Sequence, residues 1–198
     1  PESITRYNIV PGLLGIILTM SMVMMTALAV TREYERGTME NLLAMPVRPI
    51  EVMAGKIAPY IIIGAVQVAV VLAAARLLFD VPFAGSIALF GIATLLFITV
   101  NLAIGFTFST IARNQLQAMQ MSFFFLMPSI LLSGFAFPFR GMPGWAQVIG
   151  EILPATHFLR IVRGLMLKAA ELNQVAGELA VLALMLILVS TVAVARYR

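Results

Sequence analysis

Five long apolar runs divide this chain, and they limit its fold more than any other feature of the sequence. The runs are residues 9–30, 57–79, 87–112, 121–139 and 174–195. Each can cross the hydrocarbon core of a bilayer as a helix, because about 20 residues at roughly 1.5 Å each span it. Lipid offers no hydrogen-bond partner to the backbone, so a lone span must be helical. We therefore predict an all-α fold, in which residues 1–198 form a single polytopic transmembrane helical domain.

Composition agrees with this class and excludes several others. Hydrophobic residues make up 61% of the chain and charged residues only 11%, which is too few for the polar surface of a soluble domain. The chain has one histidine and no cysteine, so we predict no metal site and no thiol chemistry. Basic residues stand mostly at the ends of the apolar runs, and no basic tract is interleaved with aromatic residues. The expected surroundings are the lipid membrane rather than nucleic acid.

Residues 31–56 form a charged island between the first two apolar runs, with eight of the chain's twenty-two charged residues. The first helix should continue through Thr31–Arg36, and Gly37 should loosen the chain. Thr38 can then cap a short helix that Pro46 ends. The side chains on one face of this helix are apolar (Met39, Leu42 and Leu43), whereas Glu40 and Asn41 face away. The pattern predicts a short amphipathic helix at a membrane surface.

The island also carries the pattern E-x-x-x-G-T-x-E-x-L-L-x-x-P, formed by Glu33, Gly37, Thr38, Glu40, Leu42, Leu43 and Pro46. This pattern resembles the coupling-helix region of type-2 ABC export permeases, which docks on a separate ATPase subunit. The resemblance implies an ATPase contact made by Glu33, Glu35, Arg36, Met39, Glu40, Leu42 and Leu43. The alternative is an ordinary cytoplasmic loop whose basic residues serve only to orient the protein.

Prolines divide residues 140–173 into two short helices, the first opened by Pro143 and closed by Pro154. The second helix is amphipathic, and we expect its apolar face at the outer membrane boundary. His157 lies on the polar face, where solvation is a simpler expectation than a role as proton relay. A second motif again resembles the permease family, in which this segment forms outer re-entrant helices that cap the exit of the pathway. Its residues are Leu132, Gly134, Phe137, Pro138, Met142, Pro143, Trp145, Pro154, Thr156, Phe158 and Arg163.

The distribution of basic residues orients the five spans. The side that holds residues 31–56 also holds Arg113, Arg196 and Arg198. It is the more basic side once the amphipathic segment 140–173 is set aside, so we expect it in the cytoplasm. Complete permeases of the family have six spans with both ends cytoplasmic. The resemblance therefore implies a fragment that lacks the first span, in a multi-pass protein of the bacterial inner membrane.

Polar side chains within the spans mark a tentative translocation path. Gln67 and Asn101 lie near the middle of the second and third spans, where an unpaired amide is costly. Asn101, Gly105 and Ser109 recur at four-residue intervals on one helix face. We assign Gln67, Asn101 and Ser109 to the path, and the alternative is a face of small residues that packs against another helix.

No G-x-x-x-x-G-K-[ST] phosphate loop occurs in the chain, so we expect no enzymatic activity of its own. The resemblance implies that a partner ATPase binds ATP and Mg, and that a second permease subunit, identical or related, completes the transporter. This chain is then expected to bind no cofactor. The competing classes are an ion-coupled secondary transporter and a membrane scaffold that does not transport. Ionisable groups near the membrane midplane, which ion coupling usually needs, are missing from the predicted spans.

Overall fold

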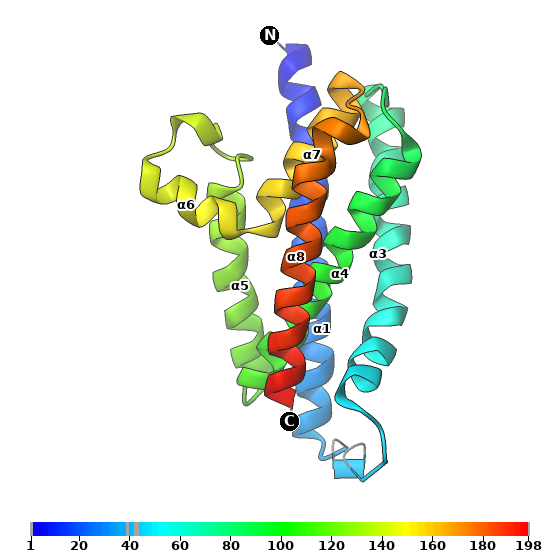
Figure 1. Cartoon of the computed structure of the whole chain (residues 1–198), viewed down its shortest axis with the longest axis vertical. Coiled ribbons are helices and arrows are strands. Elements are labelled where there is room, and N and C mark those ends of the chain that lie inside the picture. The colour runs from blue at the N-terminus through cyan, green and yellow to red at the C-terminus, as the bar shows by residue number, and fades with distance from the viewer. Residues whose placement is uncertain (1, 39, 42–43, 198) are drawn as a thin grey trace.

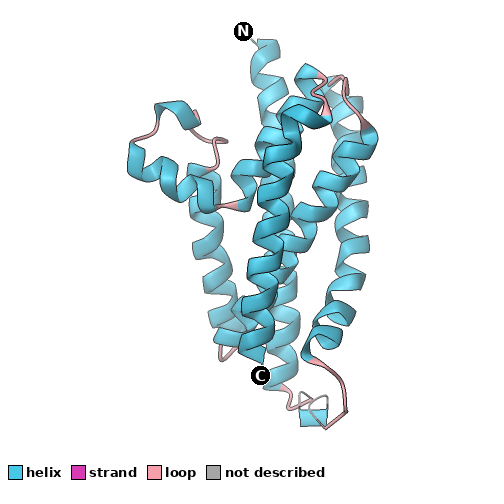
Figure 2. Ribbon diagram, viewed as in Figure 1, coloured by secondary structure: helices cyan, strands magenta, loops and turns pink. Residues whose placement is uncertain are grey.

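The computed structural model describes residues 2–38, 40–41 and 44–197, and every regular element in these ranges is a helix (Figures 1 and 2). Five helices are long and apolar enough to cross a membrane. They are α1 (Glu2–Glu35), α3 (Pro49–Phe79), α4 (Ile87–Ile111), α5 (Gln115–Leu132) and α8 (Leu172–Tyr197). Between α5 and α8 lie the 3₁₀ turn η1 (Phe139–Gly141), α6 (Gly144–Ile152) and α7 (Pro154–Lys168). The predicted all-α polytopic fold is confirmed.

Two helix boundaries differ from the apolar runs. Helix α3 begins at Pro49, eight residues before the run at 57–79, so the end of the charged island is helical. Proline suits the first turn because no helical bond needs its missing N–H. The Glu51 carboxylate accepts a hydrogen bond from the Arg48 backbone N–H at 3.0 Å, which supports this start. The first turns of α3 contain charged residues, so a prediction based on the length of the apolar run did not include them.

Helix α5 runs over Gln115–Leu132 rather than the predicted 121–139. The Asn114 side chain accepts from the Gln117 backbone N–H at 2.8 Å and so caps the earlier start. Gly134 has a φ of +89°, a left-handed conformation that glycine adopts without strain and that breaks the helix. The residues after it are apolar but form a turn, which composition alone could not distinguish from a span.

Helices α1 and α4 form the centre of the bundle, and α3, α5 and α8 surround them (Figure 1). Helix α4 packs against α1 and α8. At Gly105 the backbones of α1 and α4 come so close that an added Cβ would lie 2.5 Å from the Val23 carbonyl oxygen. A small residue at this position permits close packing of the two central helices.

Helix α7 lies inside the protein, against α1, α4 and α8. The Phe158 ring stacks on the Phe97 ring of α4, with centroids 4.1 Å apart. Other side chains of α7 are also buried, including Leu159, Ile161, Val162, Leu165 and Met166. The expectation that the membrane boundary covers this apolar face was wrong, because other helices cover it. Amphipathicity indicates that a face is apolar, but not whether lipid or protein lies on it.

The two ends of the bundle carry different segments (Figure 1). The chain between α1 and α3, the α4–α5 turn and the end of α8 lie at one end, which we call the loop end. Helices α6 and α7 and the start of α1 lie towards the opposite end. This arrangement agrees with the alternation of the predicted spans.

Candidate functional site

Two carboxylates in the last turn of α1 tie that helix to its neighbours at the loop end. Glu33 forms an ion pair with Lys56 of α3, whose side chain is 16% exposed. Glu35 accepts a hydrogen bond from the backbone N–H of Gln115 at 2.8 Å, and the Gln115 side-chain amide also donates to it. The carboxylate of Glu35 thus meets the first turn of α5, where the helix dipole favours negative charge. The ends of α1, α3 and α5 are joined by these contacts.

The turn that follows α1 is also bonded to it. Gly37 has a φ of +69°, and the Thr38 hydroxyl donates to the Glu33 carbonyl at 3.1 Å. In this contact Thr38 closes the end of α1, whereas the sequence predicted it as the cap of the next helix. Glu40 and Asn41 are helical, and the Ala44 N–H donates to the Glu40 carbonyl at 3.0 Å.

The residues assigned to the ATPase contact therefore fall into three groups. Glu33 and Glu35 hold partners within the chain. Arg36 and Glu40 are exposed, and none of the ion pairs among the described residues includes them. The apolar members, Met39, Leu42 and Leu43, lie outside the described residues. Glu33, Glu35 and Glu40 all lie in the charged island. Only the fold shows that the first two bind within the chain whereas Glu40 is exposed.

The residues assigned to the translocation path lie within the bundle, where Gln67 bonds to another helix and Asn101 and Ser109 bond to carbonyls of their own helix. The Gln67 amide nitrogen donates to the Ser21 hydroxyl of α1 at 2.8 Å. Asn101 is fully buried, and its amide nitrogen donates to the Phe97 carbonyl at 2.8 Å. Ser109 is buried and donates to the Phe106 carbonyl. Gly105, on the same face as Asn101, packs against α1, so the geometry favours helix packing, and a role in the path stays a prediction.

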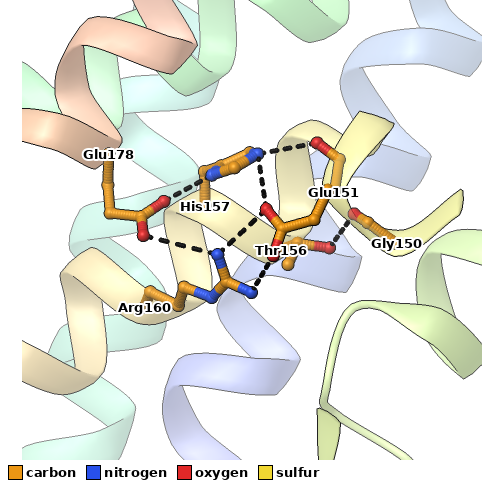
Figure 3. A network of polar contacts seen from close by, with 6 residues as sticks. All are labelled: Gly150, Glu151, Thr156, His157, Arg160 and Glu178. Carbon is orange, nitrogen blue, oxygen red and sulfur yellow. Dashed lines mark hydrogen bonds and ion pairs between the residues drawn. The ribbon is translucent and has the colours of Figure 1, made fainter. Parts of the chain in front are cut away.

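A polar network joins α6, α7 and α8 towards the opposite end (Figure 3). His157 is 3% exposed and lies between two acidic residues. Its Nδ1 contacts a carboxylate oxygen of Glu178, and its Nε2 is 2.8 Å from the backbone oxygen of Glu151. Arg160 donates to the Glu151 carboxylate at 3.1 Å and to Glu178 at 3.4 Å. The expectation of a solvated histidine was wrong, because α8 supplies a partner 21 residues away in the sequence.

Charges in this network act on one another. Hydrogen bonds from Arg160 lower the pKa of the Glu151 carboxyl below its usual value, and the same contacts raise the pKa of the Arg160 guanidinium. The guanidinium also lies over the Phe139 ring, 4.7 Å from its centroid. The network therefore contacts η1 as well as the three helices. Sequence alone offered one clue to it, the three-residue spacing of His157 and Arg160.

Arg163 of α7 fastens the turn that ends α5. Its Nη2 donates to the Gly134 carbonyl at 3.0 Å, across 29 residues of sequence. Burial lowers the pKa of this guanidinium. At the α6–α7 junction the Thr156 hydroxyl donates to the Gly150 carbonyl at 2.6 Å, also visible in Figure 3. Three residues of the predicted outer motif, Gly134, Thr156 and Arg163, thus hold its turns together.

Comparison with known proteins supplies the family. Residues 2–167 match the family model described as ABC-2 type transporter. The chain is 36% identical to the probable multidrug ABC transporter permease YbhR of Escherichia coli over 88% of this chain and 47% of that protein. It is 36% identical to the inner membrane transport permease YhhJ of Escherichia coli over 80% of this chain and 43% of that protein. A more distant relative is ABC transporter G family member 20 of Dictyostelium discoideum, at 29% identity over 82% of this chain and 22% of that protein.

No solved structure matches the chain. The chain spans about half the length of the curated bacterial relatives that it matches. The predicted permease family is confirmed, and five apolar helices agree with a multi-pass protein of the inner membrane. This chain belongs to the ABC-2 type transporter family of membrane permeases.

Proposed function

We propose that this chain is the membrane-spanning part of an export permease whose transport is driven by a separate ATPase subunit. The partner would bind ATP and Mg and hydrolyse the nucleotide, and this chain would take no cofactor. A second permease subunit, identical or related, would complete the transporter. Relatives named as probable multidrug permeases suggest drug efflux as the activity.

The observation that carries this proposal is the arrangement of the loop end. Glu33 and Glu35 bind α3 and α5, so a force applied to the loop would reach three helices through bonded side chains. Arg36 and Glu40 are exposed beside these ties and are available to a partner. We assign the docking contact to Arg36, Met39, Glu40, Leu42 and Leu43, and the transmission of movement to Glu33 and Glu35. ATP-driven closure of the partner would then shift the spans as connected bodies.

A substitution at Leu43 tests the docking contact. In the full-length permease expressed with its ATPase, we expect Leu43→Asp to abolish co-purification of the ATPase or to uncouple hydrolysis from export. A charge in a desolvated apolar contact costs on the order of 2 to 5 kcal/mol of binding. Detergent purification followed by ATPase and transport assays in vesicles measures both effects.

The matched control is Leu172→Asp, the same chemical change at an exposed residue where α8 begins, at the end remote from the loop. It should leave ATPase binding unchanged. If Leu43→Asp bound the ATPase in the wild-type ratio and coupled hydrolysis to export as the wild type does, the proposal would be contradicted. The charged island would then serve only to orient the protein.

A further inference from the structure

A cavity lies where the end of α3, the start of α4 and the turn between them meet α7, away from the loop end (Figure 1). Its volume is about 330 Å³. The turn packs so closely on α7 that a Cβ added at Gly85 would lie 2.4 Å from the Leu165 carbonyl oxygen. The rings of Phe83 and Phe90 meet edge to face, with centroids 5.3 Å apart, and form part of the wall. The turn and α7 therefore give the cavity a packed base.

One residue of the wall differs in chemistry from the rest. Within the described part of the chain, the cavity is lined by the charged Arg76 and otherwise by residues without a polar side chain. These are Leu72, Ala75, Val81, Phe83, Gly85, Ile87, Phe90 and Met166. Arg76 is exposed, and none of the ion pairs among the described residues includes it or Asp80, which lies four residues later. The positive charge at the cavity therefore has no carboxylate bound to it.

The charged and apolar parts of the cavity lie at different depths. Leu72 precedes Arg76 by about one turn of α3, and Phe90 follows Ile87 by about one turn of α4. Helix α3 runs towards this end of the bundle and α4 runs away from it, so Leu72 and Phe90 lie deeper in the membrane (Figure 1). Ile87 is 77% exposed on a spanning helix, so the cavity opens towards lipid. A cation near the membrane surface with apolar side chains below it matches the order of phosphate and acyl chain in a phospholipid.

We propose that this cavity binds a phospholipid of net negative charge. Its phosphate lies at the Arg76 guanidinium, whose N–H donors match phosphate oxygens, and an acyl chain lies between Leu72, Phe90 and Met166. A headgroup without a cation is preferred, because a choline or ethanolamine group would repel an arginine that no carboxylate neutralises. This site goes beyond the proposed transport function, and its tests need neither the ATPase nor a transported substrate.

Native mass spectrometry measures the selectivity of this site. The full-length permease in detergent micelles is titrated with phosphatidylglycerol or with phosphatidylcholine of the same acyl chains. We expect the parent to bind phosphatidylglycerol about fivefold more tightly, the effect of one basic residue at an anionic lipid. The preference should disappear in Arg76→Gln. Equal affinity of the parent for the two lipids would overturn the proposal, and so would an unchanged preference in Arg76→Gln.

The matched control is Arg140→Gln. Arg140 is also exposed, and it too is absent from the ion pairs of the described residues. It belongs to η1, which precedes α6, and Figure 1 shows α6 and α3 on opposite sides of the bundle. This variant should keep the parent's preference. An equal loss in both variants would mean that lipid binding follows the total charge of the protein, which contradicts a site at Arg76.

The apolar part of the site is tested by filling it. Leu72→Trp places a larger side chain in the cavity and should remove the preference for phosphatidylglycerol, although Arg76 is still present. Leu77→Trp, at a position that is 84% exposed and outside the cavity lining, should keep it. Glycerol 3-phosphate, which has the phosphate without the acyl chains, should not displace the lipid. A parent-like preference in Leu72→Trp, or displacement by glycerol 3-phosphate, would show that the apolar walls bind no acyl chain and would contradict the proposal.

Discussion

Glu33 and Glu35 lie two residues apart in the last turn of α1, yet they bind different helices. Residues at this spacing point in different directions on a helix. Glu33 meets Lys56 of α3, and Glu35 meets Gln115 of α5. Both contacts occupy carboxylates that were predicted from the sequence to contact a partner protein. The role of a charged residue in the island therefore depends on the helix that its side chain faces.

The Glu33–Lys56 pair should show an interaction energy of about 1 kcal/mol in a double-mutant cycle of Glu33→Gln and Lys56→Met. The value is modest because the Glu33 side chain is 38% exposed, so water screens the pair. Unfolding in mixed micelles, followed by circular dichroism, measures each variant. The combination of Glu40→Gln with Lys56→Met serves as the control and should be additive within about 0.5 kcal/mol. If the Glu33 cycle were additive as well, the Glu33–Lys56 pair would contribute nothing to the free energy of unfolding.

Acid should weaken the polar network of α6, α7 and α8 through Glu151. Its folded-state pKa lies below the usual value of about 4.3, so its contribution is complete above that pH and is lost as the pH falls through the folded-state pKa. The side chain is 45% exposed, and we expect only about 0.5 kcal/mol. Between pH 7 and pH 3, the parent should lose that much more unfolding free energy than Glu151→Gln. An equal loss in both proteins would rule out this contribution.

At the scale of elements, the two central helices depend on glycine for their approach. Gly105 allows α4 to touch the backbone of α1, whereas nothing lies within 4 Å of a Cβ added at Gly91 of the same helix. These glycines look alike in the sequence, since both stand in one apolar run. Their environments predict opposite effects of the same substitution.

Gly105→Ala should destabilise the protein by about 1 to 3 kcal/mol, because the new methyl group would lie 2.5 Å from the Val23 carbonyl oxygen. Gly91→Ala should be neutral or stabilising by up to about 1 kcal/mol, since alanine favours the helix and meets no neighbour. Unfolding of the two variants in the same micelles compares them directly. A similar effect of both substitutions would argue against a close contact of α1 and α4.

At the scale of the whole molecule, the fold separates the loop end from the end that carries α6 and α7. The α1–α3 connection, which contains Glu40, and the α4–α5 turn, which contains Arg113, lie at the loop end (Figure 1). Trp145 belongs to α6 and Lys168 to α7, which lie towards the opposite end. Single cysteine substitutions can report the orientation of the molecule in the membrane, because residues 1–198 contain no cysteine. In intact cells, a membrane-impermeant thiol reagent should label Lys168→Cys and spare Glu40→Cys. If the reagent labelled only Glu40→Cys, the orientation would be the opposite of the predicted one.

The amino-acid sequence was enough to predict the fold class, the number of apolar helices and the segments between them. These follow from local requirements, since lipid forces each long apolar run to satisfy its own backbone bonds. Motifs in residues 31–46 and 132–163 were also sufficient to indicate the permease family. The start of α3 and the end of α5 were missed, because caps and a left-handed glycine define helix ends independently of hydropathy.

Which surfaces contact one another became visible only in the folded structure. It covered the apolar face of α7 with three other helices and brought Glu178 to His157. It also placed Asn101 in the interior beside the tight contact of α1 and α4. An amphipathic pattern has the same period whether its apolar side meets lipid or protein, and a partly buried pair separated by 21 residues leaves no local signal. Contacts between distant segments depend on how the helices pack, which hydropathy and periodicity do not encode.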